Sequence, residues 1–379
     1  MEYIALKDVC KINMGQSPDS SSYNENEDGI PFFQGNADFG ERYPVTRVWC
    51  NAPTKVAQPE DILISVRAPI GALNFAKEEC CIGRGLAALT PDRNKVSLEF
   101  IYWLLKGKNK ELNSKGTGST FKAISRKVLE EMLVPDMDIE KQHECAEILE
   151  KIYSIIQKQK KELFHLDNLI KARFVEMFGD PDINPKGWTE CVLSEKLNVV
   201  GGYAFKSNMF DEDGGIPVLR IGNINAGYFK PVNLVYWQEE KGLERYAMYP
   251  GDLVMSLTGT VGKDDYGNVC ILGDDYEMYY LNQRNAKLEI KEGIGKFYLS
   301  QLLKFEQIKK KLTGISRGVR QANISNKDIL NLVVPVPPME LQNQFSDFVA
   351  QVDKSKVAVQ KALAEAQLLF DSLMQQYFG

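Results

Sequence analysis

The sequence predicts an α+β protein built by internal duplication, in which two similar globular domains alternate with two long helices. Residues 116–179 align with residues 316–379 at a constant offset of 200, and thirteen of the 64 aligned pairs are identical. The front part of each half shares shorter motifs with the other half. The rear part of each half runs for about 38 residues without glycine or proline, which is typical of a continuous helix.

The shared motifs in the front parts indicate one framework with loops of different length. Gly29-Ile30-Pro31 corresponds to Gly215-Ile216-Pro217, residues 59–65 correspond to residues 250–256, and Arg84 corresponds to Arg284. The offset drifts from 186 to 200 along these motifs, so the loops between them differ in length. Because loops carry function and tolerate insertion, this pattern predicts two domains that do the same task on different targets. Duplication without any functional difference is the alternative.

The globular parts, residues 1–139 and 187–339, are rich in glycine, proline and aromatic residues and are expected to mix strands with short helices. Short apolar runs predict strands at Asp61–Val66, Leu253–Leu257 and Cys270–Leu272. Shorter helices are predicted near Leu98–Lys106 and Phe297–Lys310.

The long helices are predicted at residues 140–179 and 340–379, with a linker at residues 180–186. Proline precedes each helical run, and Gly179 and Pro181 follow the first. Apolar side chains at heptad-like spacing define one stripe on each helix: Ile148, Ile152, Ile155, Leu166, Leu169 and Met177 on the first, and Phe345, Phe348, Val352, Val359, Ala366, Leu369 and Leu373 on the second. Each stripe needs a cover, so we expect an antiparallel, coiled-coil-like pair with pseudo-twofold symmetry. Packing of each helix along its own domain is the alternative.

Positive charge gathers in two equivalent places, although the formal net charge of the chain is −5. The two clusters occupy residues 106–127 and 304–327, and each contains one acidic residue and a loop rich in small polar residues. Exposed amides, hydroxyl groups and cations suit contact with DNA phosphates, whereas solvated surface loops are the alternative. The candidates in these loops are Lys115, Thr117, Ser119, Lys122, Arg317, Arg320 and Gln321.

Other polar residues on predicted loops are candidates for reading base edges, which requires arginine, lysine, asparagine, glutamine or hydroxyl side chains. In the first half these are Gln16, Ser17, Gln34, Asn36, Arg67 and Arg84. In the second half these are Lys206, Ser207, Arg220, Asn223, Asn225, Thr258, Thr260, Lys263, Gln283 and Arg284. Each one taken singly has the alternative of an ordinary surface or turn residue, and Asn36 and Asn223 follow a glycine as turn residues often do.

No catalytic constellation can be assembled from the sequence. The segment from Gly259 to Asp264 resembles the end of a phosphate loop, but Leu257 stands where the first glycine is required. His143 and His165 lie 22 residues apart on one predicted helix and are expected at its surface. The seven cysteines are irregularly spaced, which favours reduced thiols in a cytosolic protein over a zinc site. Neither a signal peptide nor a membrane span is expected.

The whole pattern resembles the specificity subunits of type I restriction-modification systems. The resemblance rests on the alternation of domains and helices, and on the junction Met177–Pro181 with Asn184–Trp188. It also rests on Gly202–Ser207, on the Gly-Ile-Pro and Gly-Asn pairs, and on the Ser-x-Lys, Val-Pro and Glu-x-Gln series at residues 125–142 and 325–342. The first domain departs from the second at its start, where Met14–Pro18 stands in place of Gly201–Ser207.

The resemblance implies a non-catalytic protein with two target recognition domains, each reading half of a split site in double-stranded DNA. It implies that the paired helices set the separation of the half-sites and bind two methylation subunits, which restriction subunits then join. Methyl donor, ATP and magnesium would belong to those partners, and no cofactor is expected in this chain.

Overall fold

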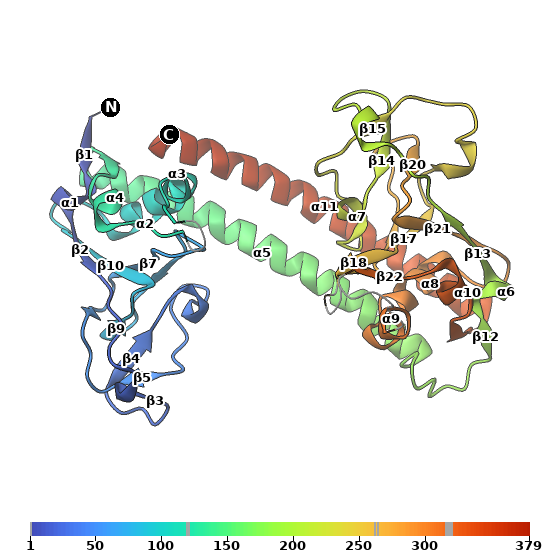
Figure 1. Ribbon diagram of the computed structural model, residues 1–379, viewed down its shortest axis with the longest axis horizontal. Coiled ribbons are helices and arrows are strands. Elements are labelled where there is room, and N and C mark those ends of the chain that lie inside the picture. Colours follow the sequence, from blue (N-terminus) through green and yellow to red (C-terminus); the bar gives the residue numbers. More distant parts are fainter. Residues whose placement is uncertain (1, 119–121, 261–262, 264, 315–320) are drawn as a thin grey trace. The chain divides into compact units, whose positions relative to one another are not determined.

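The computed structural model describes residues 2–118, 122–260, 263, 265–314 and 321–379 of the chain. The chain divides into two compact units (Figure 1). Unit 1 contains Met1–Lys161 and Gln360–Gly379, and unit 2 contains Glu162–Val359. Both division points fall inside the two long helices, α5 (Ile139–Phe178) and α11 (Met339–Phe378), so each helix contributes one end to each unit. The domain borders drawn from the sequence stay a prediction.

Unit 1 contains a four-stranded antiparallel sheet, a five-stranded sheet and a separate pair of strands. The four-stranded sheet has the order β2 (Cys10–Met14), β10 (Leu86–Pro91), β7 (Ile62–Ser65) and β8 (Leu73–Phe75). The five-stranded sheet has the order β3 (Tyr23–Asn24), β5 (Trp49–Cys50), β4 (Ile30–Phe33), β9 (Cys80–Ile82) and β6 (Val56–Ala57). β1 (Tyr3–Ala5) pairs with β11 (Leu133–Pro135). The short helices are α1 (Leu6–Val9), α2 (Leu98–Gly107), α3 (Asn109–Ser114) and α4 (Arg126–Glu130).

Unit 2 repeats this plan, except that its second sheet is described with four strands instead of five. Its first sheet has the order β13 (Leu197–Gly201), β21 (Asn285–Ile290), β17 (Leu253–Ser256) and β19 (Val269–Ile271). Its second has the order β15 (Tyr236–Trp237), β14 (Ile216–Leu219), β20 (Tyr279–Leu281) and β16 (Ala247–Met248). β12 (Glu190–Val192) pairs with β23 (Val333–Pro335). The short helices are α6 (Leu193–Lys196), α7 (Ile221–Ile224), α8 (Lys296–Leu303), α9 (Glu306–Thr313) and α10 (Asn326–Leu330).

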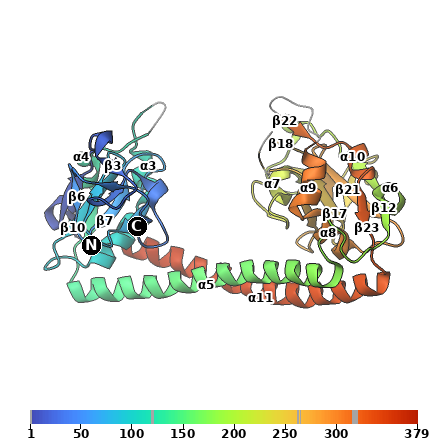
Figure 2. The same cartoon turned by 90° about the horizontal axis from the view of Figure 1, so that it is seen from below.

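The shared topology confirms the predicted duplication. In both units the second sheet contains one parallel pair, β4 with β9 and β14 with β20, among antiparallel ones. Unit 2 adds a two-stranded ribbon of β18 (Thr258–Thr260) and β22 (Gln321–Asn323). In this unit the ribbon lies at the end opposite α5 and α11 (Figure 2). The strands expected at Asp61–Val66, Leu253–Leu257 and Cys270–Leu272 are confirmed as β7, β17 and β19.

The two long helices pack against each other in antiparallel order within each unit. In unit 1, Tyr153 of α5 lies 6.0 Å from Phe370 of α11 between ring centroids. In unit 2, Phe174 of α5 lies 5.6 Å from Phe345 of α11. The residue number of the contact on α11 decreases from 370 to 345 as the residue number on α5 increases from 153 to 174. The expected antiparallel pair is therefore confirmed. The ends of α5 and α11 also belong to the apolar core of each domain. Each helix therefore packs along a domain as well as against the other helix.

The predicted apolar stripes are partly wrong. Ile148, Ile155, Leu169 and Leu369 are between 41% and 51% exposed, whereas the neighbouring Leu149, Ile156 and Ile170 are buried. A regular heptad stripe serves a helix that faces one partner helix. Here each helix faces both a partner helix and a domain, so the buried positions shift to an adjacent face.

The helix predicted at Phe297–Lys310 is also wrong in one respect, because it is two helices. The chain is extended at Phe305, with φ −66° and ψ 133°, between α8 and α9. This break places the Phe305 ring 5.0 Å from the ring of Phe174, where it is 4% exposed. Burial of a large aromatic ring compensates for the interrupted helix. The helix predicted at Leu98–Lys106 is confirmed as α2.

Among the described residues, no helix is long and apolar enough to cross a membrane. The seven cysteines have free thiols, of which Cys145 and Cys191 are half-buried and the other five buried.

Candidate nucleic-acid interface

A small cleft in unit 2 brings together three of the predicted base-reading residues. Thr258, Gln283 and Arg284 line this cleft of about 410 Å³ together with Asn323. Thr258 and Asn323 are direct partners across the β18–β22 ribbon. Gln283 and Arg284 lie in the tight turn between β20 and β21, where both are exposed. The cleft therefore combines amide, hydroxyl and guanidinium groups, which are the groups that recognise base edges.

The backbone around this cleft is held firmly. The Leu257 amide donates to the Arg284 carbonyl at 2.8 Å, and the Ile324 amide donates to the Leu257 carbonyl at 2.8 Å. The hydroxyl oxygen of Thr258 is buried and has no hydrogen-bond partner among the described residues. A buried polar atom without a partner costs free energy, so the Thr258 hydroxyl is an unsatisfied polar group beside the cleft.

Unit 1 gathers a comparable set of residues around Ser17. The Gln34 side-chain amide and the Arg84 backbone amide each donate to the Ser17 hydroxyl at 3.3 Å. The Gln16 amide donates to the Ile82 carbonyl at 3.0 Å, which fixes this segment beside β9. Arg84 is exposed between Gly83 and Gly85, both buried. A Cβ at Gly85 would lie 2.4 Å from the Gln34 carbonyl oxygen, so the close approach of these two loops requires glycine there.

Three other candidates, Asn223, Arg220 and Asn225, use their side chains in hydrogen bonds to nearby loops. Asn223 is 1% exposed; its side chain accepts from the Arg220 amide at 2.9 Å and donates to the carbonyls of Lys230 and Val232. The Arg220 guanidinium donates to the Asn233 carbonyl. Asn225 donates to the Asp265 carbonyl at 2.6 Å. The base-reading prediction for Asn223 is therefore corrected, because its amide is consumed by the turn that its position after glycine suggested.

Thr260 is occupied by Asp265, whose carboxylate accepts from the Thr260 amide at 2.8 Å and from its hydroxyl at 2.9 Å. The donation from the Thr260 amide holds the pKa of the Asp265 carboxyl below its usual range. Asn36 lies at the start of a short 3-10 helix and is half-exposed.

The remaining candidates divide into exposed and engaged residues. Four exposed cations are Arg67, Lys122, Lys206 and Lys263, and two exposed hydroxyl residues are Thr117 and Ser207. Lys115 is paired with Glu111 at 2.6 Å. Ser119, Arg317 and Arg320 lie outside the described residues, and Gln321 is described only by its backbone in β22.

Three consecutive lysines of the second cluster, expected to contact phosphate, are engaged within unit 2. Lys309 is 8% exposed, and its ammonium donates to the Asn268 side-chain oxygen at 2.7 Å. Lys310 pairs with Glu306 at 2.5 Å and Lys311 with Asp182 at 2.9 Å. The phosphate assignment for Lys309 is corrected, since its ammonium points into the protein.

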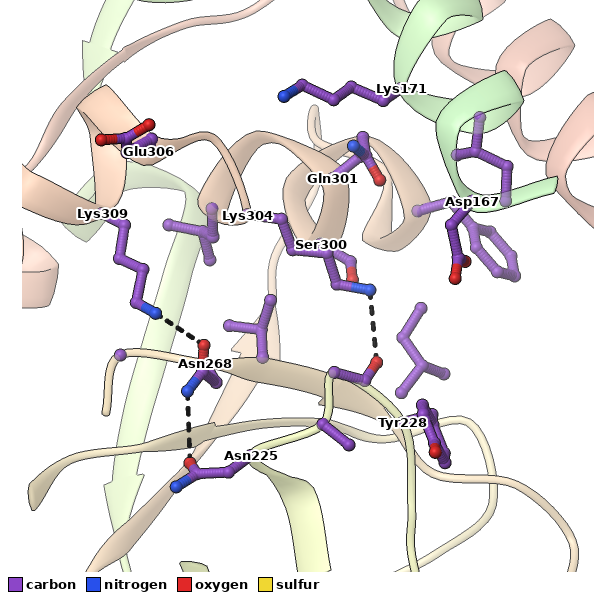
Figure 3. A pocket seen from close by; sticks show the side chains of 18 of the residues that line it. Asp167, Lys171, Asn225, Tyr228, Asn268, Ser300, Gln301, Lys304, Glu306 and Lys309 are labelled. Atoms are coloured by element: carbon purple, nitrogen blue, oxygen red, sulfur yellow. Dashed lines mark hydrogen bonds between the residues drawn. The ribbon is translucent and has the colours of Figure 1, made fainter. Parts of the chain in front are cut away.

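A larger pocket of about 1120 Å³ lies between α9, α8 and the parts of α5 and α11 in unit 2 (Figure 3). Two of its lysines are used internally: Lys304 donates to the Gly227 carbonyl at 3.3 Å, and Lys356 pairs with Asp167 at 2.8 Å. Burial lowers the pKa of Lys304, with a further contribution from the nearby Lys356. This pocket is thus part of the packing between the domain and the helices.

The comparisons with known proteins agree with this arrangement. The profile of the family described as type I restriction modification DNA specificity domain matches residues 1–164 and 185–366. The chain belongs to this family.

Individual relatives of this specificity-domain protein are specificity subunits. The MjaVIII specificity subunit of Methanocaldococcus jannaschii is 26% identical over 301 residues, covering 71% of this chain and 68% of that protein. The EcoBI specificity subunit of Escherichia coli is 21% identical over 417 residues, covering 99% and 85%. The MjaX specificity subunit of M. jannaschii is 45% identical over 152 residues, which are 40% of this chain and 36% of that protein.

Solved structures show the same fold. The S subunit of a type I system from M. genitalium aligns with a TM-score of 0.60 and 16% identity, covering 100% of this chain and 96% of that chain. A chain from a study of complex assembly and conformational transition of the type I R-M system aligns with a TM-score of 0.52 and 18% identity, covering 100% and 97%. The family, the duplicated α+β fold and the resemblance noted from the sequence are thereby confirmed.

Sequence reasoning missed Asn323 as a cleft residue of this specificity subunit. Asn323 lies beside the repeated Ile324-Ser325 motif, in a segment that reads as a loop because β22 has three residues. The available signal was its place in the sequence, because Asn323 directly precedes this repeated motif. His143 and His165 are exposed, as expected. Among the described residues, no group of three or more His, Cys, Asp or Glu side chains could hold a metal ion.

Proposed function

We propose that this chain is the DNA-recognition subunit of a type I restriction-modification complex and reads a two-part target, one part with each unit. The observation that carries the proposal is that one topology is present twice and presents different polar groups in the two units. Unit 1 presents Gln16, Gln34 and Arg84, whereas unit 2 presents Thr258, Gln283, Arg284 and Asn323. Two different sets of polar residues on one framework suit two different half-sites.

The partners of the chain follow from the same proposal. Two methylation subunits bind the paired helices, and restriction subunits join that complex. The transferred methyl group, ATP and magnesium are bound by those partners, while this chain supplies sequence recognition without catalysis. Exposed apolar side chains on the helices, such as Phe164 at 63% and Leu368 at 74%, support a role of α5 and α11 in binding other proteins.

Mapping of methylated sites tests this function. DNA from cells that contain the methylation subunits with and without this chain would be sequenced for methylated bases. We expect a two-part motif that depends on the chain, and Arg284→Ala is expected to relax one part while Arg84→Ala relaxes the other. A methylation pattern that does not change when the chain is lost would contradict the proposal and favour a scaffold that does not read DNA. Purified chain supplied with methyl donor and magnesium is expected to neither methylate nor cut DNA.

A further inference from the structure

The loop that carries the β18 strand of unit 2 is closed at its base by the backbone. The Ser256 amide donates to the Asn268 carbonyl at 2.9 Å, and the Gly267 amide donates to the Ser256 carbonyl at 2.8 Å. The Asn268 amide donates to the Ser256 hydroxyl at 3.1 Å. The chain therefore leaves the sheet at Leu257 and rejoins it after Gly267 at one fixed point. This loop includes Thr258 of the cleft.

The Lys309 side chain and the Thr313 backbone carbonyl, both of α9, hold the base of this loop. The Lys309 ammonium donates to the Asn268 side-chain oxygen at 2.7 Å (Figure 3). One turn later in the same helix, the Thr313 carbonyl accepts from the Tyr266 hydroxyl at 2.9 Å. Gly267 has φ +70° and passes close to Lys309, with a Cβ position 3.5 Å from its Cε.

Hydrogen bonds continue from this point to the ribbon. The Asn268 side-chain amide donates to the Asn225 side-chain oxygen at 3.4 Å, and Asn225 donates to the Asp265 carbonyl at 2.6 Å. The Asp265 carboxylate then accepts from the amide and hydroxyl of Thr260. Lys309 is thus connected through three residues to β18, the strand that bears Thr258.

Unit 1 closes the equivalent loop with the same set of hydrogen bonds. The Ser65 amide donates to the Ala72 carbonyl at 2.9 Å, the Gly71 amide donates to the Ser65 carbonyl at 2.9 Å, and the Ala72 amide donates to the Ser65 hydroxyl at 3.0 Å. These bonds reproduce those of Ser256, Gly267 and Asn268. The enclosed loop is residues 66–71 and includes the candidate Arg67.

The helix position that holds the loop is also the same. The repeat offset of 200 places Asn109 of α3 at Lys309 and Asn113 at Thr313. The Asn109 amide donates to the Gly71 carbonyl at 3.0 Å and to the Ile70 carbonyl at 3.2 Å. The Asn113 amide donates to the Ile70 carbonyl at 3.0 Å. Gly71 has φ +84° and Gly267 has φ +70°, so the glycine beside the helix has a left-handed backbone conformation in both units.

We propose that Asn109 in unit 1, and Lys309 with Asn268 in unit 2, are positioning residues for base recognition. We call these contacts the loop clamp. The inference rests on the proposed function. The loop of residues 66–71 in unit 1 and the longer loop of residues 257–267 in unit 2 are each held at the base by a side chain from an equivalent helix position. The helix–loop contact is therefore present in both units, although the loops differ in length and sequence. The clamp fixes where each loop begins and ends, and the loop then presents its own polar groups to a half-site.

Salt dependence distinguishes a positioning lysine from a phosphate contact. Lys309→Met would be compared with Lys310→Met in the complex with the methylation subunits, on the target found by methylation mapping and on a scrambled duplex. We expect Lys309→Met to weaken target binding about fivefold, the scale of one lost hydrogen bond, with unchanged affinity for the scrambled duplex. The slope of log affinity against log salt should not change. A slope reduced by about 0.9 would make Lys309 a phosphate contact and overturn the proposal.

Two further variants keep the test decisive if Lys309→Met lowers stability. Asn268→Asp retains an oxygen for Lys309 but removes the donor to Asn225, and Asn109→Ala removes the clamp of unit 1. We expect Asn268→Asp to reduce discrimination only at the half-site affected by Arg284→Ala, and Asn109→Ala only at the other. Discrimination equal to that of the unmodified chain in both variants would overturn the clamp. Failure of the unmodified chain to prefer its target would instead refute the proposed function.

Discussion

Phe174 is the side chain whose removal should most weaken unit 2. It is fully buried near the end of α5, and its ring lies 5.0 to 5.6 Å from the rings of Phe178, Tyr298, Phe305 and Phe345. These rings come from α5, from the region of α8 and α9, and from α11. Phe174→Ala would therefore open a cavity at the point where both long helices join the domain.

The size of the effect follows from the burial. Truncation of a buried phenylalanine to alanine costs about 3–5 kcal/mol, and the aromatic pairs add to this loss, so we expect about 4 kcal/mol. For a unit of this size, each kcal/mol lowers the melting temperature by about 2–4 °C, which gives a decrease of about 8–16 °C. Phe164→Ala, on the same helix at 63% exposure, should change the stability by less than about 0.5 kcal/mol.

Differential scanning calorimetry of the two variants measures both effects. Hydrogen exchange of the β21 amides would then show whether the loss is located in unit 2. A Phe174→Ala variant that melts within about 2 °C of the unmodified chain, less than about 1 kcal/mol, would refute the view that this aromatic cluster joins the helices to the domain.

Three further predictions concern recognition and pH. Arg284→Ala should cost about 1–3 kcal/mol at one half-site, measured by competition between targets changed at single base pairs, and an equal loss at every duplex would contradict a base contact. Lys122→Ala, by contrast, should weaken binding to all duplexes alike and reduce the salt slope by about 0.9, as seen in titrations at several salt concentrations. Burial lowers the pKa of Lys106 to about 8, beneath its value in the unfolded chain, although its ammonium lies 3.6 Å from the Tyr153 ring centroid. Because the unfolded chain then binds the extra proton, the free energy of unfolding should rise between about pH 8 and pH 10, and urea denaturation of Lys106→Met should lack this rise.

Charge reversal at Lys309, Lys310 and Lys311 together would be a poor test of phosphate contact by the second basic cluster. Since Lys309 is buried against Asn268, a carboxylate there would be placed in the protein interior and destabilise unit 2. Lys122 is exposed and therefore gives the cleaner test.

The duplication, the long helices and their antiparallel pairing were predictable because they depend on patterns that extend over many residues. The exact buried face of α5 could not be predicted. Ile148 and Leu149 are both aliphatic, and which of them is buried depends on a second packing partner. The break at Phe305 was hidden for a similar reason, because the gain comes from an aromatic ring of α5 far away in the chain.

The candidate site was predictable in part. Arg84 and Arg284 could be found because they are equivalent in the repeat and stand on tight turns. Asn223 and Lys309 were misassigned because their residue types suit DNA contact equally well. Only the three-dimensional environment shows that the Asn223 amide completes a turn and that the Lys309 ammonium points inward.

The paired strands at the borders of each domain have an evolutionary consequence. Tyr3 lies opposite Pro135 across β1 and β11, and Glu190 lies opposite Pro335 across β12 and β23. The chain thus enters and leaves each domain at adjacent points. A segment whose two ends meet can be transplanted as a cassette without moving the flanking helices. A new cassette needs to match this short strand pair and the helix surface beneath it, so one scaffold can acquire a new specificity by exchange of a single contiguous stretch of gene.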